Sequence, residues 1–213
     1  MSQFLRRYFE EAAAVAQQLD VGVVDAMVER LVRLRQEGGR LFLCGVGGGA
    51  GNCSHAVNDF RKLARIEAYS PVDNVSELTA RTNDEGWETV FAEWLKVSRA
   101  GARDVLFILS VGGGSPERRI SVNLVAAIDE AKARGLDVLG IVGRDGGYTK
   151  RRGDLVLVIP TVNERAVTPH TEAFQAVVWH ALVCDPRLMA QENTWESTVA
   201  AQGVGPRRLE GSP

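Results

Sequence analysis

Residues 41–60 read LFLCGVGGGAGNCSHAVNDF, a short apolar run that meets a cluster of glycines and continues with helical spacing. Glycine lets the backbone approach a ligand closely, and the free N–H groups at a helix N-terminus favour an anion. The helical part carries His55 and Asp59, which lie four residues apart and therefore on one face. This stretch predicts a strand, a glycine turn and a helix that together hold an anionic ligand.

The composition excludes several classes of protein. The 213 residues are 45% hydrophobic and 24% charged, which suits one α/β domain with appendages. A net charge of −2 with mixed signs argues against nucleic-acid binding. No apolar run has the length of a membrane span, and the N-terminus lacks the apolar core of a signal peptide. Cys44, Cys53 and Cys184 predict buried free thiols, so we expect a soluble cytoplasmic protein without a membrane partner.

The hydrophobic pattern alternates strands and helices after residue 40. Continuous apolar runs such as residues 106–109 are typical of strands buried on both faces of a parallel sheet. The expected strands are 41–44, 67–72, 104–110, 137–142 and 154–159, and the expected helices are 3–19, 23–36, 50–64, 87–99, 117–134 and 170–184. The alternation predicts an α/β fold, a three-layer αβα sandwich around a doubly wound, parallel, five-stranded sheet.

Three regions are expected along the chain. Residues 1–38 form two amphipathic helices before the first strand, and such an arm is poorly buried unless it forms an oligomer. Residues 39–186 form the α/β domain. Residues 187–213 form a polar, glycine-rich C-terminal tail.

A second glycine-rich loop, SVGGGSP at 110–116, also follows an expected strand. We expect Pro116 to lie just inside the start of the next helix. The two loops could direct backbone donors at one anion, with the hydroxyls of Ser110 and Ser115 as further ligands. For either loop alone, an ordinary tight turn is an equally open interpretation. Neither is a P-loop, because no Gly-Lys-Ser/Thr follows.

Further titratable residues lie near the C-terminus of the domain. Glu172 and His180 are eight residues apart on the last expected helix, about 12 Å along its axis, and His170 precedes it. The His55–Asp59 pair could also be a simple surface hydrogen bond, and His180 a core histidine. Taken together, two histidines and two carboxylates suit general acid–base chemistry or a divalent metal ion. Asn83 and Asp84 are expected in a loop. They could bind a ligand there, or they could cap the helix that follows.

These residues resemble the sugar isomerase (SIS) domain family, and most closely its phosphoheptose isomerases, as far as about residue 185. The marks are Gly45 with His55 ten residues later, the Asn83-Asp84 segment, the loop 110–115 and GRDGG at 143–147. The resemblance implies isomerisation of sedoheptulose 7-phosphate to D-glycero-D-manno-heptose 7-phosphate through an enediol. It also implies a homotetramer with active sites between subunits.

The resemblance also assigns roles to individual residues. Asp59 and His180 fall at catalytic positions of the family, and a zinc ion would be held by His55, Asp59, Glu172 and His180. The positions implied to bind substrate are Gly47, Gly48, Gly49, Asn83, Asp84, Ser110, Gly112, Ser115 and Glu172.

The chain departs from the family in both glycine loops. Residues 45–49 replace Gly-Asn-Gly-Gly-Ser by GVGGG, and residues 110–115 replace Ser-Thr-Ser-Gly-Asn-Ser by SVGGGS. Each lost side-chain hydrogen bond to a charged group is worth about 1–3 kcal/mol. Asp59 is one methylene shorter than the family's Glu, and Glu172 replaces a Gln. The alternatives are therefore an isomerase of a different sugar, or a non-catalytic SIS-fold protein that binds phosphosugars or proteins, similar to relatives that bind the bacterial replication initiator.

Overall fold

A five-stranded parallel sheet forms the centre of the computed structural model, which describes residues 2–191. The strand order is β2-β1-β3-β4-β5, with all neighbours parallel, which confirms the expected doubly wound sheet. The strands are β1 (Arg40–Gly45), β2 (Glu67–Tyr69), β3 (Val105–Ser110), β4 (Asp137–Val142) and β5 (Leu155–Val158). Strand β2 is shorter than expected because Pro71 begins the 3₁₀ turn η1 (Pro71–Asp73), and proline cannot donate to a strand ladder.

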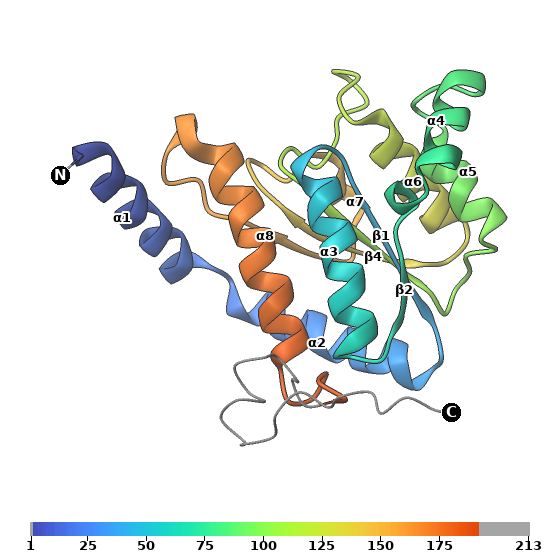
Figure 1. Cartoon of the computed structure of the whole chain (residues 1–213), viewed down its shortest axis with the longest axis horizontal. Helices are drawn as coiled ribbons and strands as arrows, with labels where there is room; N and C mark the ends of the chain where they lie inside the picture. Colours follow the sequence, from blue (N-terminus) through green and yellow to red (C-terminus); the bar gives the residue numbers. More distant parts are fainter. Residues whose placement is uncertain (1, 192–213) are drawn as a thin grey trace, which may run out of the picture.

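Helices cover both faces of this sheet (Figure 1). One face carries α2 (Val21–Gln36), α3 (Gly48–Lys62) and α8 (Val167–Cys184), and the other carries α5 (Val90–Val97) and α6 (Val122–Ala133). All six residues of β3 are buried, with Phe107 in the core on the α3 and α8 side and Leu106 in the core on the α5 and α6 side. The unbroken apolar run therefore reflects burial on both faces.

The first glycine loop lies where the strand order reverses, between β1 and β3. Residues at the carboxyl ends of these neighbours meet there, since Gly45 is in register with Leu109. In open parallel sheets, ligands bind beyond this point. The two glycine loops that follow β1 and β3 are thus brought to one edge of the sheet.

Residues 115–120 form a closed loop and not the start of the helix expected at 117–134. Ser115 and Ile120 make an antiparallel bridge through N–H···O bonds of 2.9 and 3.0 Å. Helix α6 therefore begins at Val122, and Pro116 lies in the loop, outside the helix.

The sequence analysis missed helices α4 (Val75–Asp84) and α7 (Gly147–Arg152), and it overestimated α5, expected at 87–99. The Asn74 side chain caps α4 by accepting from the Glu77 N–H at 3.3 Å, and Arg81 forms an ion pair with Glu77 one turn away. Asn83 and Asp84 consequently lie in the last turn of α4 and not in a loop.

Helix α8 begins three residues earlier than expected, which places Pro169 in its first turn, where the helix needs no N–H from it. His170 is therefore a buried residue of α8 and does not precede the helix. Cys44 and Cys53 are buried free thiols as expected, whereas Cys184, at the end of α8, is exposed.

Helix α1 (Gln3–Gln18) extends away from the sandwich (Figure 1). It contacts the start of α8, where the Tyr8 ring stacks on His170 with centroids 4.6 Å apart and Glu11 Oε2 lies 3.2 Å from His170 Nε2. Most of the tail expected at 187–213 lies outside the described residues. Within residues 2–191, no helix has the length and apolar character needed to cross a bilayer.

Candidate functional site

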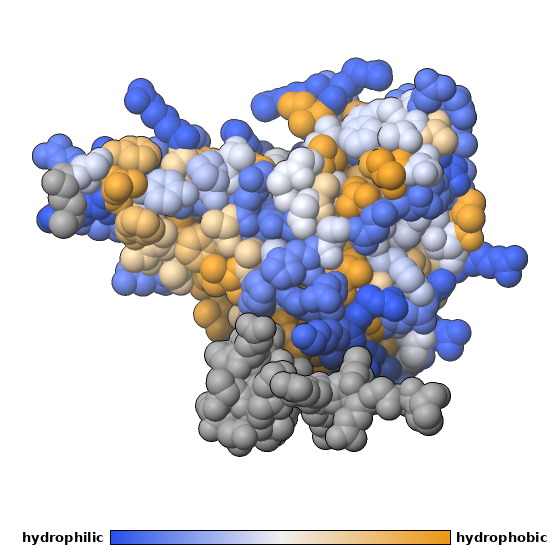
Figure 2. Space-filling model, in the orientation of Figure 1, coloured by the Kyte–Doolittle hydropathy of each residue, from blue (hydrophilic) through white to orange (hydrophobic). Residues whose placement is uncertain are grey.

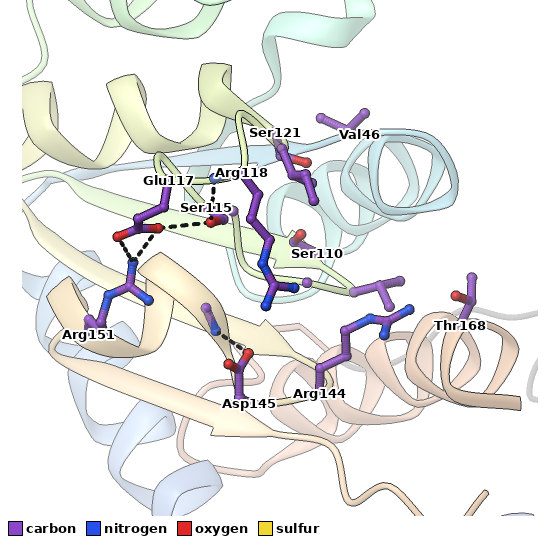
Figure 3. A pocket seen from close by; sticks show the side chains of 15 residues that line it. Val46, Ser110, Ser115, Glu117, Arg118, Ser121, Arg144, Asp145, Arg151 and Thr168 are labelled. Carbon is purple, nitrogen blue, oxygen red and sulfur yellow. Dashed lines mark hydrogen bonds and ion pairs between the residues drawn. The ribbon is translucent and has the colours of Figure 1, made fainter. Parts of the chain in front are cut away.

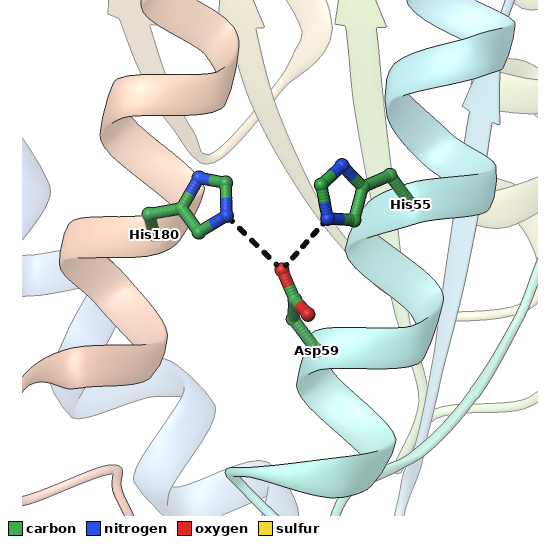
Figure 4. Close-up of side chains that lie close together, drawn as sticks. All are labelled: His55, Asp59 and His180. Atoms are coloured by element: carbon green, nitrogen blue, oxygen red, sulfur yellow. Dashed lines mark ion pairs between the residues drawn. The ribbon is translucent and has the colours of Figure 1, made fainter. Parts of the chain in front are cut away.

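Three of the four expected metal-binding residues form one cluster (Figure 4). His55 and Asp59 project from successive turns of α3, and His180 projects toward them from α8. Asp59 Oδ2 lies 3.6 Å from His55 Nε2 and 3.3 Å from His180 Nε2. The spacing of four residues puts the α3 pair on one face, and the packing of α3 against α8 supplies the second imidazole.

The Asp59 carboxylate is held in one orientation by neighbouring donors. The indole N–H of Trp179 donates to Oδ2 at 3.1 Å, and the Asn58 amide donates to Oδ1 at 3.0 Å. Asp59 is only 8% exposed, whereas the two histidine side chains are partly open to solvent. The carboxylate is thus fixed at the bottom of the cluster, with both imidazoles above it.

The tautomer of His180 follows from its second contact. Its Nδ1 lies 2.7 Å from the carbonyl oxygen of Ala176, which can only accept, so Nδ1 carries a proton and donates. In the neutral ring, Nε2 is then an acceptor that faces the acceptor Oδ2 of Asp59. Two facing acceptors at 3.3 Å need a proton or a cation between them, so the pair can take up either one.

This donor set fits a divalent metal ion. The ligand atoms of His55, Asp59 and His180 lie within 4.8 Å of one another, and two imidazoles with one carboxylate are typical of catalytic zinc. The Nδ1–H bond of His180 to a carbonyl is the kind of second contact that orients a metal-binding histidine.

Glu172 is not part of this cluster, so the expected set of four ligands is reduced to three. Its side chain lies at the start of α3, where a Cβ atom on Gly48 would come within 2.4 Å of Glu172 Cδ. Glycine at 48 therefore makes room for this carboxylate, which is favoured by the positive end of α3. Asn52 joins the two helices by donating to the Glu172 carbonyl at 3.0 Å and to Gln175 at 2.7 Å.

A cavity of about 750 Å³ lies beside the second glycine loop (Figure 3). It is lined by Ser110, Gly112 and Ser115 of the expected substrate-binding set, together with Val46 of the first loop. Gly47, Gly48 and Gly49 do not line it. Asn83 lines a separate hollow with residues of α4 and Trp87, and Asp84 pairs with Asn83 at 2.7 Å. In a single chain, the structure therefore leaves Asn83 and Asp84 apart from the cavity.

The sequence analysis missed three arginines that line this cavity: Arg118, Arg144 and Arg151. Arg118 and Arg119 fall within the helix expected at 117–134. Charged residues in a helix usually indicate a face that is exposed to solvent, so no binding role was predicted for them. Arg144 lies in the GRDGG segment, which is a mark of the family resemblance but assigns no role to this arginine. The Arg118-Arg119 pair directly after the glycine-rich loop was a signal that could have revealed Arg118.

A family model described as "SIS domain" matches residues 7–143. The lincomycin biosynthesis protein LmbN of Streptomyces lincolnensis is 32% identical over 84% of this chain, which spans 66% of LmbN. A phosphoheptose isomerase of Helicobacter pylori strain P12 is 31% identical over 78% of this chain and 84% of its own length.

Solved structures with the same fold include the phosphoheptose isomerase GmhA of Neisseria gonorrhoeae. It superposes with a TM-score of 0.75 and 24% identity, over 85% of this chain and 96% of that chain. The arrangement of the sheet and helices in this chain is therefore similar to that in GmhA.

Proposed function

This chain belongs to the SIS domain family, and we propose that it is a phosphosugar aldose–ketose isomerase of the phosphoheptose isomerase type. The proposed reaction converts sedoheptulose 7-phosphate into D-glycero-D-manno-heptose 7-phosphate. The observation that carries the proposal is the cluster of Asp59, His55 and His180, in which a buried carboxylate faces two imidazoles.

The reaction needs one base and one acid. Asp59 removes a proton from C1 of the ketose while His180 supplies a proton to the carbonyl oxygen at C2, which gives an enediol. Asp59 then gives the proton it took from C1 to C2, and His180 takes the proton from O1, which gives the aldose. No electrons leave the substrate, and both residues recover their initial protonation.

We further propose that a zinc ion can occupy the same cluster, held by His55, Asp59 and His180 in place of the proton that His180 and Asp59 otherwise share. Such an ion would polarise the substrate oxygens as a Lewis acid. Glu172 is proposed to contact the substrate near Gly48, and not the ion. Along α3, His55 lies seven residues after Gly48, a separation of about 10 Å that an extended sugar phosphate can bridge.

The proposed assembly is a homotetramer with active sites between subunits. Two features support it. Helix α1 presents an apolar face that the described residues 2–191 leave exposed, and Asn83 and Asp84 lie away from the cavity of their own chain. A partner subunit could bring these two residues to the site. The free thiols are typical of a reducing compartment, and we propose that the protein acts in the cytoplasm.

The test is turnover of sedoheptulose 7-phosphate by the purified protein, followed by NMR, together with metal analysis of the same sample. We expect conversion to the aldose and bound zinc that is lost in His55→Ala. The matched control is Lys62→Gln, at an exposed position of the same helix whose side chain makes no hydrogen bond or ion pair with the three cluster residues. A wild-type protein without turnover on any ketose phosphate would exclude the isomerase and favour the non-catalytic binding role.

A further inference from the structure

Two of the cavity's arginines have no acidic partner. Arg118 comes from the loop 115–120 and Arg144 from the end of β4, and their side chains enter the cavity from different sides (Figure 3). Within residues 2–191, neither guanidinium group makes a hydrogen bond or an ion pair. The third, Arg151, differs because it pairs with Glu117 at 3.2 Å.

The acidic residues of the cavity wall are already engaged. Glu117 accepts from Arg151 and from the Ser115 hydroxyl at 2.9 Å, and Asp145 accepts from the Gly147 N–H at 3.1 Å. Hydrogen bonds from its own backbone N–H and from Ser115 hold the pKa of Glu117 below its ordinary value of 4.5, so it stays ionised and paired with Arg151. The charges of Arg118 and Arg144 therefore remain uncompensated at the cavity.

The loop holds Arg118 in a defined place. In addition to the Ser115–Ile120 bridge, the Arg118 N–H donates to the Ser115 hydroxyl at 3.2 Å. The Glu117–Arg151 pair ties the loop to α7. Arg118 is thus presented by a closed, tethered loop and not by a free side of a helix.

The helix N-termini near the glycine loops already have partners. The N–H groups of Tyr148 and Thr149, in the first turn of α7, donate to the carbonyls of Gly114 and Gly113 at 2.8 and 2.9 Å. The start of α3 carries the Glu172 carboxylate. In contrast, Gly112 and Gly114 line the cavity, and their N–H groups donate to no other described residue.

We propose that Arg118 and Arg144 bind the substrate's phosphate, together with the backbone N–H groups of Gly112 and Gly114. The guanidinium groups replace the hydrogen-bonding side chains of the family that this loop lacks at Val111, Gly112 and Gly114. A guanidinium fork binds two phosphate oxygens at once, which a hydroxyl cannot do. This inference rests on the proposed function, since it takes the anion to be the phosphate of a sugar phosphate.

The test compares Arg118→Gln and Arg144→Gln with Arg119→Gln, by titration calorimetry with inorganic phosphate. Arg119 is exposed on the same loop, has the same charge and does not line the cavity, so it is a matched control. We expect each of the first two variants to weaken phosphate binding about tenfold or more, and Arg119→Gln to change it less than about twofold. Arg118→Lys should recover part of the loss, because it restores the charge without the fork.

Kinetics with sedoheptulose 7-phosphate give a second readout. Because the phosphate is remote from the reacting carbons, KM should rise in Arg118→Gln by about the same factor as the phosphate affinity falls. Equal phosphate affinity in wild type, Arg118→Gln and Arg144→Gln would overturn the inference. Absence of turnover in the wild type would instead overturn the proposed function, and the phosphate titrations would still decide the role of the arginines.

Discussion

Asp59 differs from an ordinary surface carboxylate in three respects. It is buried, it accepts from the indole of Trp179, and its Oδ2 faces two imidazoles. Neither imidazole comes close enough for a good hydrogen bond in this state, since the distances are 3.3 and 3.6 Å. The space between these atoms is therefore suited to a proton in transfer or to a metal ion.

Asp59→Asn tests this reading at the residue scale. Asparagine keeps the size of the side chain and can still accept from Trp179, but it cannot act as a base. We expect kcat to fall by at least about 100-fold, with little change in the melting temperature. Lys62→Gln is the control, because Lys62 is exposed on the same helix and makes no hydrogen bond or ion pair with another described residue. If Asp59→Asn kept more than a tenth of the wild-type rate, Asp59 would not be the base.

The sequence predicts part of this cluster and not all of it. His55 and Asp59 follow from helical spacing alone, since residues four apart share a face. His180 was grouped with them by residue type and by the family resemblance, but its contact with α3 depends on how two helices pack, which the sequence does not show. Glu172 was assigned to the metal set for the same reason, yet two helical turns separate it from His180. The Trp179 hydrogen bond to Asp59 has no sequence signal.

At the element scale, the parallel sheet with both faces buried follows from the apolar runs, whereas the short elements do not. Helix α7 has six residues, and the loop 115–120 is fixed by its backbone bridge and a tether to α7. Neither leaves a periodic pattern long enough to detect. The arginines proposed to bind phosphate lie in just these short segments, so the sequence could not place them at the cavity.

Asp104 joins the starts of β1 and β3. Its carboxylate accepts from the Arg40 backbone N–H at 2.8 Å and guanidinium at 2.8 Å, and from the Gly101 N–H at 2.9 Å. Burial raises the pKa of this carboxyl, but the Arg40 hydrogen bonds outweigh burial, and the pKa lies below its ordinary value of 3.8. A lowered folded-state pKa means that the ionised form stabilises the fold above about pH 4 and that this contribution is lost as pH falls through the folded-state value.

Asp104→Asn should therefore reduce the free energy of unfolding by about 2 kcal/mol at pH 7, because Arg40 keeps its charge without its partner. The difference from wild type should shrink as the pH falls below the ordinary carboxyl pKa of 3.8 and wild-type Asp104 becomes protonated. Urea unfolding at several pH values measures both effects. Glu29→Gln, an exposed carboxyl on α2, serves as the control and should show neither. A constant difference across this pH range would contradict the assignment.

At the scale of the whole molecule, helix α1 is the part that one chain leaves incomplete. Phe4, Leu5 and Phe9 are 70%, 52% and 67% exposed, and Figure 2 shows apolar side chains gathered on this arm and on the surface next to it. The helix is nevertheless anchored at two points, since Val15 near its C-terminal end lies in the core and Tyr8, next to Phe9, stacks on His170. An anchored helix with an uncovered apolar face is well placed to pack against another copy of the chain.

Phe9→Glu tests the proposed assembly. A charge in a buried contact between subunits is costly, so we expect the tetramer to dissociate, measured by light scattering after size-exclusion chromatography. Gln17→Glu adds the same charge to an exposed position of the same helix and should leave the tetramer intact. If sites lie between subunits, turnover should fall together with the mass, while circular dichroism stays unchanged. If the Phe9→Glu protein kept both its mass and its activity, α1 would have another role than subunit contact. In that case an interface formed by α1 would not bring Asn83 and Asp84 to the cavity.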